Sequence, residues 1–521
     1  MRQILFIIFL TCFTIQVHPQ FIPESYLLSG EDDYLSKISS ANPISNSISD
    51  IITIGDTVWL GTSRGVSVSF DRGENWTNFY NTAPFGEDQI ATISYYKGML
   101  WAATLTDAED LSGETIPKGT GLKYTTNNGE TWTSIPQPVD GVNDTIEIYG
   151  INTIRARPIT ATELNVTWDI AFTQDAVLTI WTTSYGAGTR KSTDMGQTWE
   201  RVVLPPDYLD SIHPDDTLSF CLTPTAGFCG EGNLNHESFS VIAINDSTLY
   251  VGTADGINKS TDNGKSWVKF NHLNQSRPIS GNFVNSLAYN YSTGTVWAST
   301  WRADNPEEFY AVSSSSDGGA TWQTFLDDER PHNFGFKGSD VIVATDDGAF
   351  RSSDQGSTWI LPNNIIDRNS GIVFSRKEFY SAAAEGNDVW LGSGDGLLRL
   401  RETSFWQGEW KIYRASQSLA SERETYCYPN PFSPKLDLQL NIKYSTGGKD
   451  AMVTIRIFDF GMNYVRTVIQ NAHRNEAIDS TPKDFWDGRD DRGNLLPNGV
   501  YIYRIDVDDE EPLFGKVIYM E

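Results

Sequence analysis

The chain has 521 residues, of which 39% are hydrophobic and 20% are charged, a balance typical of globular rather than disordered proteins. Its length exceeds what one ordinary domain needs. The formal net charge of -28 at pH 7 lacks the basic footprint that nucleic acids and anionic membrane surfaces require, so both partner classes are excluded.

The first twenty residues predict a secretory signal peptide, because "MRQ" supplies a positive start before the apolar run "ILFIIFLTCFTIQV". Cys12 lies inside that run, without the small residue expected before a lipidated cysteine. No later run is long and apolar enough to cross a bilayer. We therefore expect an exported protein without a transmembrane segment.

A phrase of the form [S/T]-x-D-x-G-x-x-W recurs between residues 69 and 359, with asparagine replacing the aspartate once. The acidic or amide positions are Asp71, Asn127, Asp194, Asp262, Asp317 and Asp354, and the tryptophans are Trp76, Trp132, Trp199, Trp267, Trp322 and Trp359. Each copy follows a short aromatic or apolar run such as "VWLGT" (58–62) or "VWAST" (296–300). A seventh run, "VWLGS" (389–393), leads into a decayed copy that ends at Trp410.

Each repeat predicts about four short β-strands separated by turns, and no segment shows long helical periodicity. Seven such repeats favour a seven-bladed β-propeller. In the phrase, aspartate and serine or threonine fix a tight turn, glycine supplies positive φ, and tryptophan packs between neighbouring sheets. The alternative is a calcium or ligand site repeated around a ring. It is disfavoured because the turn and the packing already account for each of these residue types.

The phrase resembles the Asp-box, or BNR, repeat of sialidases, sortilin-type receptors, some xyloglucan-cleaving enzymes and photosystem assembly-factor propellers, over roughly residues 45–413. This resemblance implies a propeller with the Asp boxes on the face away from the functional one. Fold alone does not specify activity.

Insertions at residues 105–121, 204–239 and 301–310 are expected on the opposite face, where elaborated loops favour binding. The third contains the candidate ligand-binding residues Trp301, Phe309 and Tyr310, for which ordinary loop packing is the alternative role. No catalytic residue can be named. Sialidase activity is disfavoured because the Arg-Ile-Pro motif and the arginines of that family have no counterpart here.

Cys221 and Cys229 bracket a polar loop, and an exported protein permits a disulfide between them. His213 and His236 flank the pair, but their spacing matches no zinc pattern, so we expect neither a metal nor a cofactor. Cys427 is expected to be buried as a small apolar residue.

Residues 414–425 are polar and predict a linker, after which alternating strands indicate a small β-sandwich. The elements "YPNPF", "VTIRIFD", "WDGRDDRG", "NGVYIYRI" and "FGKVIY" resemble the FlgD-type Ig-like domain and the overlapping type IX secretion sorting signal. The resemblance implies export by the type IX secretion machinery of a Bacteroidetes-like bacterium. The cluster around Asp487, Asp490 and Asp491 fits a tight turn better than a calcium loop.

The sequence therefore predicts an all-β chain with a signal peptide (1–20), a seven-bladed propeller (21–413), a linker (414–425) and a sorting domain (426–521). We expect a monomeric secreted or cell-surface protein that binds glycan or protein ligands. The alternative is a glycoside hydrolase or lyase that uses two facing carboxylates.

Overall fold

The computed structural model describes residues 38–40, 42–110, 112–224, 229, 232–303, 305–369, 374, 376–415, 423–428, 430–434, 440–475 and 483–520. The predicted signal peptide and most of the predicted linker lie outside these residues. The described residues form two compact units, 38–415 and 423–520, and their only helical element is the 3-10 turn η3 (Leu234–His236). The prediction of an all-β fold is confirmed.

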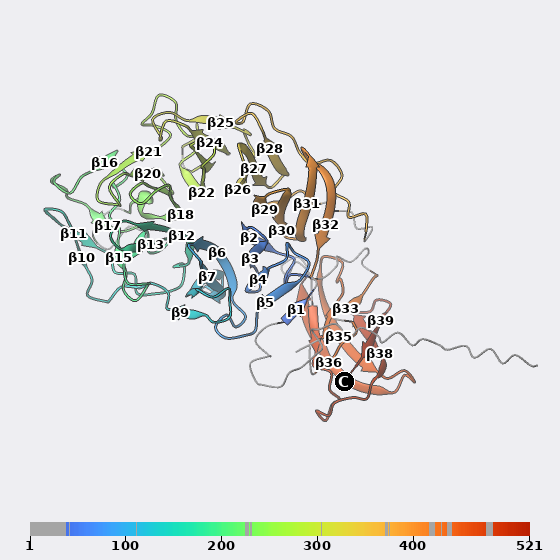
Figure 1. Ribbon diagram of the computed structural model, residues 1–521. Helices are drawn as coiled ribbons and strands as arrows, with labels where there is room; N and C mark the ends of the chain where they lie inside the picture. The colour runs from blue at the N-terminus through green and yellow to red at the C-terminus, as the bar shows by residue number, and fades with distance from the viewer. Residues whose placement is uncertain are drawn as a thin grey trace, which may run out of the picture. The chain divides into compact units, whose positions relative to one another are not determined.

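In the first unit, antiparallel sheets follow one another along the chain, each a meander whose strands pair with their sequence neighbours, apart from β1, which is added beside β5 (Figure 1). The first three sheets contain β1 (Ile38–Ser40), β2 (Ile48–Ile54), β3 (Thr57–Thr62), β4 (Val66–Ser69) and β5 (Trp76–Phe79); β6 (Gln89–Tyr96), β7 (Met99–Glu109), β8 (Thr115–Thr125) and β9 (Thr133–Ile135); β12 (Thr167–Gln174), β13 (Leu178–Ser184), β14 (Arg190–Ser192) and β15 (Glu200–Arg201).

Four further sheets of the same kind complete the series within the described residues. They contain β18 (Ser238–Ala243), β19 (Leu249–Thr253), β20 (Gly256–Ser260) and β21 (Trp267–Phe270), with β16 (Ser211–Ile212) added beside β21; β22 (Phe283–Asn290), β23 (Thr295–Trp301), β24 (Ala311–Ser315) and β25 (Gln323–Phe325); β26 (Pro331–Lys337), β27 (Asp340–Thr345) and β28 (Ala349–Ser352); β29 (Phe379–Glu385), β30 (Asp388–Ser393), β31 (Gly396–Ser404) and β32 (Gln407–Tyr413).

The first full-length strand of each sheet lies nearest a common centre, and each contacts its counterpart in the next sheet (Figure 1). The ring closes because β29 of the last sheet contacts β2 of the first. Ser381 Oγ donates to the Ile48 carbonyl at 3.3 Å across this closure. The arrangement fits a β-propeller.

Two insertions differ from the predicted loops. Residues 105–121 mostly extend β7 and β8 into a long hairpin, since Leu105 to Glu109 pair with Thr115 to Gly119. Within residues 204–239, β17 (Cys221–Leu222) pairs in parallel with β11 (Asn152–Ala156), whose other neighbour is the edge strand β10 (Ile146–Tyr149).

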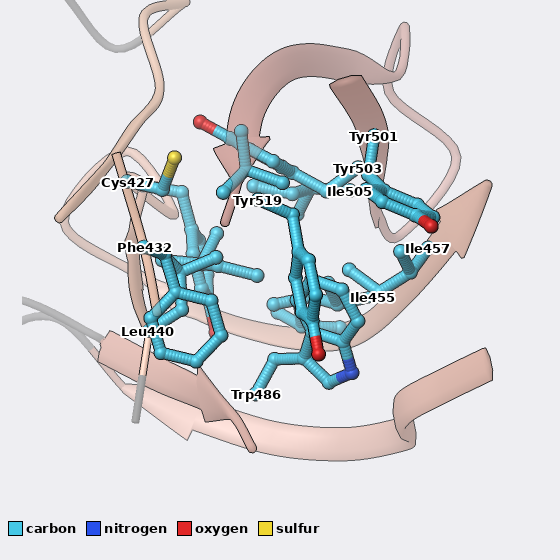
Figure 2. Packing of buried hydrophobic residues seen from close by; sticks show 14 of the residues in the cluster. Cys427, Phe432, Leu440, Ile455, Ile457, Trp486, Tyr501, Tyr503, Ile505 and Tyr519 are labelled. Atoms are coloured by element: carbon cyan, nitrogen blue, oxygen red, sulfur yellow. The ribbon is translucent and has the colours of Figure 1, made fainter. Parts of the chain in front are cut away.

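The second unit consists of two antiparallel sheets packed on one core (Figure 2). One sheet contains β33 (Tyr426–Tyr428), β34 (Leu440–Lys443) and β37 (Lys483–Trp486), and the other contains β35 (Asp450–Phe458), β36 (Tyr464–Asn475), β38 (Gly499–Val507) and β39 (Leu513–Tyr519). Side chains alternate along β38, so that Tyr501, Tyr503 and Ile505 are buried against Trp486 from the facing sheet. Cys427 is buried in the same core, where its Sγ donates to the Lys516 carbonyl at 3.2 Å.

Candidate functional site

The repeated phrase forms the same closed turn wherever it is intact. In the copy at residues 260–267, Ser260 Oγ donates to Asp262 Oδ1 at 2.8 Å and accepts from the Gly264 amide at 2.8 Å. Asp262 also accepts from the Ser266 amide at 2.9 Å and the Ser266 hydroxyl at 2.6 Å. Both oxygens of the carboxylate are therefore occupied inside the turn.

The copy at residues 125–132 shows what asparagine changes. Asn127 Oδ1 still accepts from Thr125 and from the Thr131 amide, at 2.9 and 3.0 Å. Its Nδ2 donates to the Thr131 hydroxyl at 3.0 Å, so the direction of that one hydrogen bond is reversed. The turn survives the loss of charge, which supports a structural role for the phrase.

The tryptophans of the phrase contribute to packing between sheets. Trp76 and Trp267 begin β5 and β21 and are fully buried, and Trp76 contacts Trp390 of the last sheet with ring centroids 6.3 Å apart. Trp132 contacts Trp59 of the preceding sheet at 6.2 Å. The remaining tryptophans, Trp199, Trp322 and Trp359, also lie in or against apolar clusters.

A β-bulge interrupts the innermost strand of every sheet in the described ring, close to where that strand begins. The extra residues are Ser49, Ala91, Trp168, Phe239, Asn285, His332 and Tyr380. In an antiparallel meander the first strand begins at the end opposite the turn between strands three and four. The bulges therefore lie at the end of the ring opposite the turns of the repeated phrase.

A central cavity of about 830 Å³ runs between the innermost strands, and all of the bulge residues line it. Its other end is lined by Tyr95, Tyr96, Asn245, Tyr289 and Tyr291. Bulges redirect side chains, and here they turn one residue per sheet toward the shared space. We call the bulge-lined end of this cavity the channel mouth.

Aromatic side chains form a continuous row at the channel mouth. Phe239 contacts Phe283 with ring centroids 4.4 Å apart, and Phe283 stacks on Trp301 at 6.1 Å. Trp301 contacts His332 at 5.8 Å, and His332 contacts Tyr380 at 5.7 Å. Four consecutive sheets contribute to this aromatic row, which therefore depends on the packing of neighbouring sheets rather than on any one loop.

His332 has a fixed orientation within the row. Its Nε2 is 2.6 Å from Asp346 Oδ1, so this nitrogen bonds the carboxylate while the ring faces Trp301 and Tyr380. Trp301 is fixed by its Nε1, which donates to the Pro331 carbonyl at 2.9 Å. The row is thus held in place before any ligand arrives.

Two carboxylates, Asp50 and Asp169, follow bulge residues and also line the cavity. Asp50 accepts from the Ile51 and Ile93 amides at 2.9 and 3.0 Å, and Asp169 accepts from the Ile170 and Val241 amides at 2.8 and 2.9 Å. One oxygen of each binds its own strand and the other binds the neighbouring sheet. Both acids therefore link adjacent sheets.

Enclosure in the cavity raises the pKa of both acids. Burial is the main cause for Asp50, opposed by hydrogen bonds from Ile93, Ile51 and Thr92. For Asp169, burial raises the pKa to about 7, and the negative charge of Asp50 adds to the effect. Two acids with raised pKa values in one cavity resemble a catalytic pair in electrostatics, but their oxygens already accept main-chain hydrogen bonds.

The three ligand-binding candidates from the sequence lie at different places. Trp301 belongs to the aromatic row, and Tyr310 packs against it at 5.9 Å beneath the Arg330 guanidinium, which is 4.7 Å from the Tyr310 ring. Phe309 is anchored through its amide, which donates to the Ser280 carbonyl at 3.1 Å. None of the three lines the cavity directly.

Sequence reasoning missed Phe239, His332, Tyr380 and the other bulge residues. A signal existed in the spacing. In every repeat the bulge residue lies 10 to 13 residues before the second residue of the aromatic or apolar run, such as Trp59 or Trp297, and a short polar residue often follows the bulge residue. The pattern was obscured because the bulge residues share no chemical type. Only the strand pairing shows that they occupy one structural position.

The cysteines and acidic clusters remain outside this site. The structure joins Cys221 and Cys229 in a disulfide, with Cα atoms 5.8 Å apart. Among the described residues, no cluster of histidine, cysteine or acidic side chains could hold a metal ion. Asp490 accepts from the Arg492 and Asn494 amides at 2.9 and 2.8 Å, and Asp487 pairs with Arg466 at 2.8 Å, as in a tight turn.

In the part of the chain that the structure describes, no helix has the length and apolar character required to cross a bilayer.

No protein-family model matches the chain. Among curated proteins, the xyloglucanase Xgh74A of Acetivibrio thermocellus is 25% identical over 294 residues, which cover 54% of this chain and 28% of that protein. The match thus spans little more than a quarter of the curated relative's length.

Several solved structures are similar at low identity. PorZ, a bacterial surface component of the type IX secretion system of Porphyromonas gingivalis, is 13% identical with a TM-score of 0.36, over 90% of this chain and 65% of that chain. YCF48 bound to a D1 peptide is 14% identical with a TM-score of 0.41, over 70% and 97%. An ancestral GH74 enzyme is 11% identical with a TM-score of 0.49, over 92% and 62%.

Proposed function

We propose that the first unit is a seven-bladed Asp-box propeller that binds a glycan at the channel mouth, outside the cell. The observation that carries this proposal is the aromatic row from Phe239 to Tyr380 beside a cavity of about 830 Å³. Ligand sites of this kind combine an apolar or aromatic lining with a few polar groups, and sugars present both apolar faces and hydroxyls.

The polar groups at the mouth suit a hydroxyl-rich ligand. Trp168 Nε1 and Asn285 Oδ1 are buried and have no hydrogen-bond partner among the described residues. One is a donor and the other an acceptor, and both residues line the cavity. A hydroxyl group that reached either atom would satisfy it, whereas a purely apolar ligand would leave both unpaired. The similarity to a curated xyloglucanase supports the same ligand class.

A second candidate function is a glycoside hydrolase or lyase that uses Asp50 and Asp169. It is favoured by the raised pKa of Asp169, about 7, because a general acid must keep its proton near neutral pH. It is disfavoured by the hydrogen bonds that both acids accept from main-chain amides of two sheets. A carboxylate held in this way has little freedom to exchange a proton with a substrate.

The binding proposal is tested with a glycan panel that includes xyloglucan oligosaccharides, measuring affinity and release of reducing ends together. Replacing Tyr380 by alanine should weaken binding by about 10-fold, the order expected when one aromatic contact of about 1.4 kcal/mol is lost. The matched control is Tyr291→Ala, which changes an aromatic residue at the other end of the same cavity.

Equal losses in the two variants would place the ligand elsewhere, and absence of binding to the whole panel by folded protein would reject a glycan ligand. Release of reducing ends that disappears in Asp169→Asn, with binding retained, would establish the hydrolase instead. No release at saturating glycan is the expected result.

We further propose that residues 426–521 form an Ig-like sorting domain that directs export through the type IX secretion machinery. The sequence elements from "YPNPF" to "FGKVIY" support this, as does the two-sheet fold that they build. Deleting residues 426–521 should strand the first unit in the periplasm of a type IX-competent host. Undiminished display at the cell surface would contradict the proposal.

A further inference from the structure

A second, smaller cavity lies beside the outer strands of the third sheet, away from the channel. Arg157, Arg190 and Arg201 contribute to its lining, together with Thr189 and His236. Its volume is about 20 Å³, which is enough for one ordered water molecule. The cavity can therefore hold a water molecule or a small ion.

Arg190 reaches this cavity with an incompletely paired guanidinium. Its side chain is 3% exposed, and its Nη1 pairs with Asp140 Oδ1 at 2.7 Å. Its Nε and Nη2 are buried and have no hydrogen-bond partner among the described residues. The three unpaired N–H groups on these two nitrogens of a buried cation are costly, so a structure that keeps them calls for an acceptor.

The unpaired atoms form the edge of the guanidinium that suits an anion best. Elsewhere in this chain, the same edge grips a carboxylate: Nε and Nη2 of Arg351 bind Asp340 Oδ2 at 3.0 and 2.7 Å. Those of Arg504 bind Asp506 Oδ1 at 2.8 and 2.6 Å. Such two-point contacts are the preferred geometry for arginine and an anionic oxygen. At Arg190 no described side chain supplies that anion.

Nearby acids are already committed to other groups. Asp140 pairs through Oδ1 with Arg190 and through Oδ2 with Arg201 at 2.8 Å, and Oδ2 also accepts from the Ile159 amide at 2.7 Å. Glu147 lies 3.4 Å from Arg201 Nη1. Arg190 and Arg201 are directly opposite on β14 and β15, and Asp140 offsets the repulsion between them. Asp140 therefore has no further oxygen to offer the free edge of Arg190.

We propose that the cavity beside β14 binds one small monovalent anion, a halide or the carboxylate of a short acid, on Nε and Nη2 of Arg190. This site is separate from the channel mouth and does not depend on the glycan proposal. Its consequence is a folded state whose stability depends on the anion present, because the ligand binds only where Asp140 and Arg190 are assembled.

The test uses bromide and formate as probes of the two anion classes. Crystals of the full chain soaked in bromide should show an anomalous peak within hydrogen-bonding distance of Arg190 Nε and Nη2. In solution, bromide or formate should raise the Tm of the wild type above its value in gluconate, a bulkier anion, at equal ionic strength. A response to formate alone would identify a carboxylate site, and a response to both would identify a general anion site.

Arg190→Lys should abolish the anion-dependent rise in Tm, because lysine keeps a charge for Asp140 but lacks the two-donor edge. The control is Arg351→Lys, another buried arginine, whose three guanidinium nitrogens each bind a carboxylate; this variant should keep the rise. Absence of an anomalous bromide peak at Arg190 together with no rise in Tm in formate, or equal anion responses in wild type and Arg190→Lys, would overturn the proposal and leave only water in the cavity.

Discussion

At Asp262, one side chain organises an entire turn. Its carboxylate accepts hydrogen bonds from Ser260, the Ser266 hydroxyl and the Ser266 amide, so both oxygens are used within eight residues of chain. Because these hydrogen bonds are all made within the turn, the phrase can recur without a ligand at each copy. The hydrogen bonds of the turn are satisfied by its own residues, which favours a structural role for the phrase over a ligand-binding one.

Replacing Asp262 by alanine should lower the free energy of unfolding by about 1 to 2 kcal/mol, the usual cost of losing a side chain that caps main-chain amides. Asp262→Asn should cost clearly less, because Asn127 already holds the equivalent turn with one hydrogen bond reversed. Urea denaturation of the three proteins measures the difference. Equal losses for alanine and asparagine would show that charge, not the acceptor oxygen, stabilises the turn.

The aspartates of the repeated phrase also predict how the stability of the fold depends on pH. Hydrogen bonds led by the Thr198 and Thr321 hydroxyls lower the pKa of Asp194 and Asp317 to about 2, from an ordinary value of 3.8. Between these values the unfolded chain binds more protons than the folded one, so stability rises with pH there. The contribution is present above about pH 4 and is lost as the pH falls toward 2.

Thermal unfolding of wild type between pH 2 and 5 should therefore show a falling Tm at the acid end, and Asp194→Asn combined with Asp317→Asn should flatten that slope. Asn127→Asp adds a titrating carboxylate and should steepen the slope. A double variant whose Tm follows the wild-type curve would show that other acids dominate.

At the scale of the element, each turn of the repeated phrase also contacts the preceding sheet. Gly264 has φ of +77°, and a Cβ placed there would lie 2.5 Å from Cη2 of Trp181 on β13. The glycine therefore does two things: it permits the turn and it lets the tryptophan of the previous sheet reach the backbone. This explains why an aromatic run and a glycine turn alternate along the sequence.

Gly264→Ala should destabilise the protein by about 2 to 4 kcal/mol, since overpacking adds to the strain of positive φ. The control is Gly386→Ala, where φ is +58° and no atom lies within 4 Å of the new Cβ. That change should cost only about 1 kcal/mol from backbone strain. Chemical denaturation of both variants decides the matter, and equal costs would show that contact with Trp181 is unimportant.

The sequence predicted these elements well and the channel poorly, for a physical reason. Turns and aromatic runs are local, so Asp71 or Trp267 can be recognised from its neighbours. The aromatic row joins Phe239 to Tyr380 across 141 positions of sequence, and its members touch only because four consecutive sheets pack side by side. Trp301 was named as a candidate because it borders an insertion, whereas His332 lies at a strand bulge and shares no chemical type with the other bulge residues. Likewise, nothing near Arg190 in sequence reveals that two of its nitrogens lack a partner.

For the first unit as a whole, closure depends on side chains from both ends of the ring. Arg399 of β31 donates to the Arg72 carbonyl at 2.6 Å and pairs with Glu74 at 3.1 Å. Lys411 also pairs with Glu74, at 2.9 Å. These contacts join residues more than 300 positions apart and involve the first copy of the repeated phrase. The turn of that copy, which is formed by local hydrogen bonds, thus also supplies acceptors for the contacts that close the ring.

We expect the second unit to fold independently, because in the part of the chain that the structure describes its core consists of residues between Cys427 and Tyr519 (Figure 2). It contains a single tryptophan, Trp486, which is 1% exposed and whose Nε1 donates to the Arg489 carbonyl at 2.9 Å. Expressed alone, residues 423–521 should show blue-shifted Trp486 fluorescence that shifts to the red in one cooperative urea transition, as small domains with one core do. Gly515→Ala should move this transition to lower urea, because a Cβ there would lie 2.0 Å from the Tyr503 ring. Red-shifted emission from the isolated unit without denaturant would mean that this core needs the rest of the chain to form.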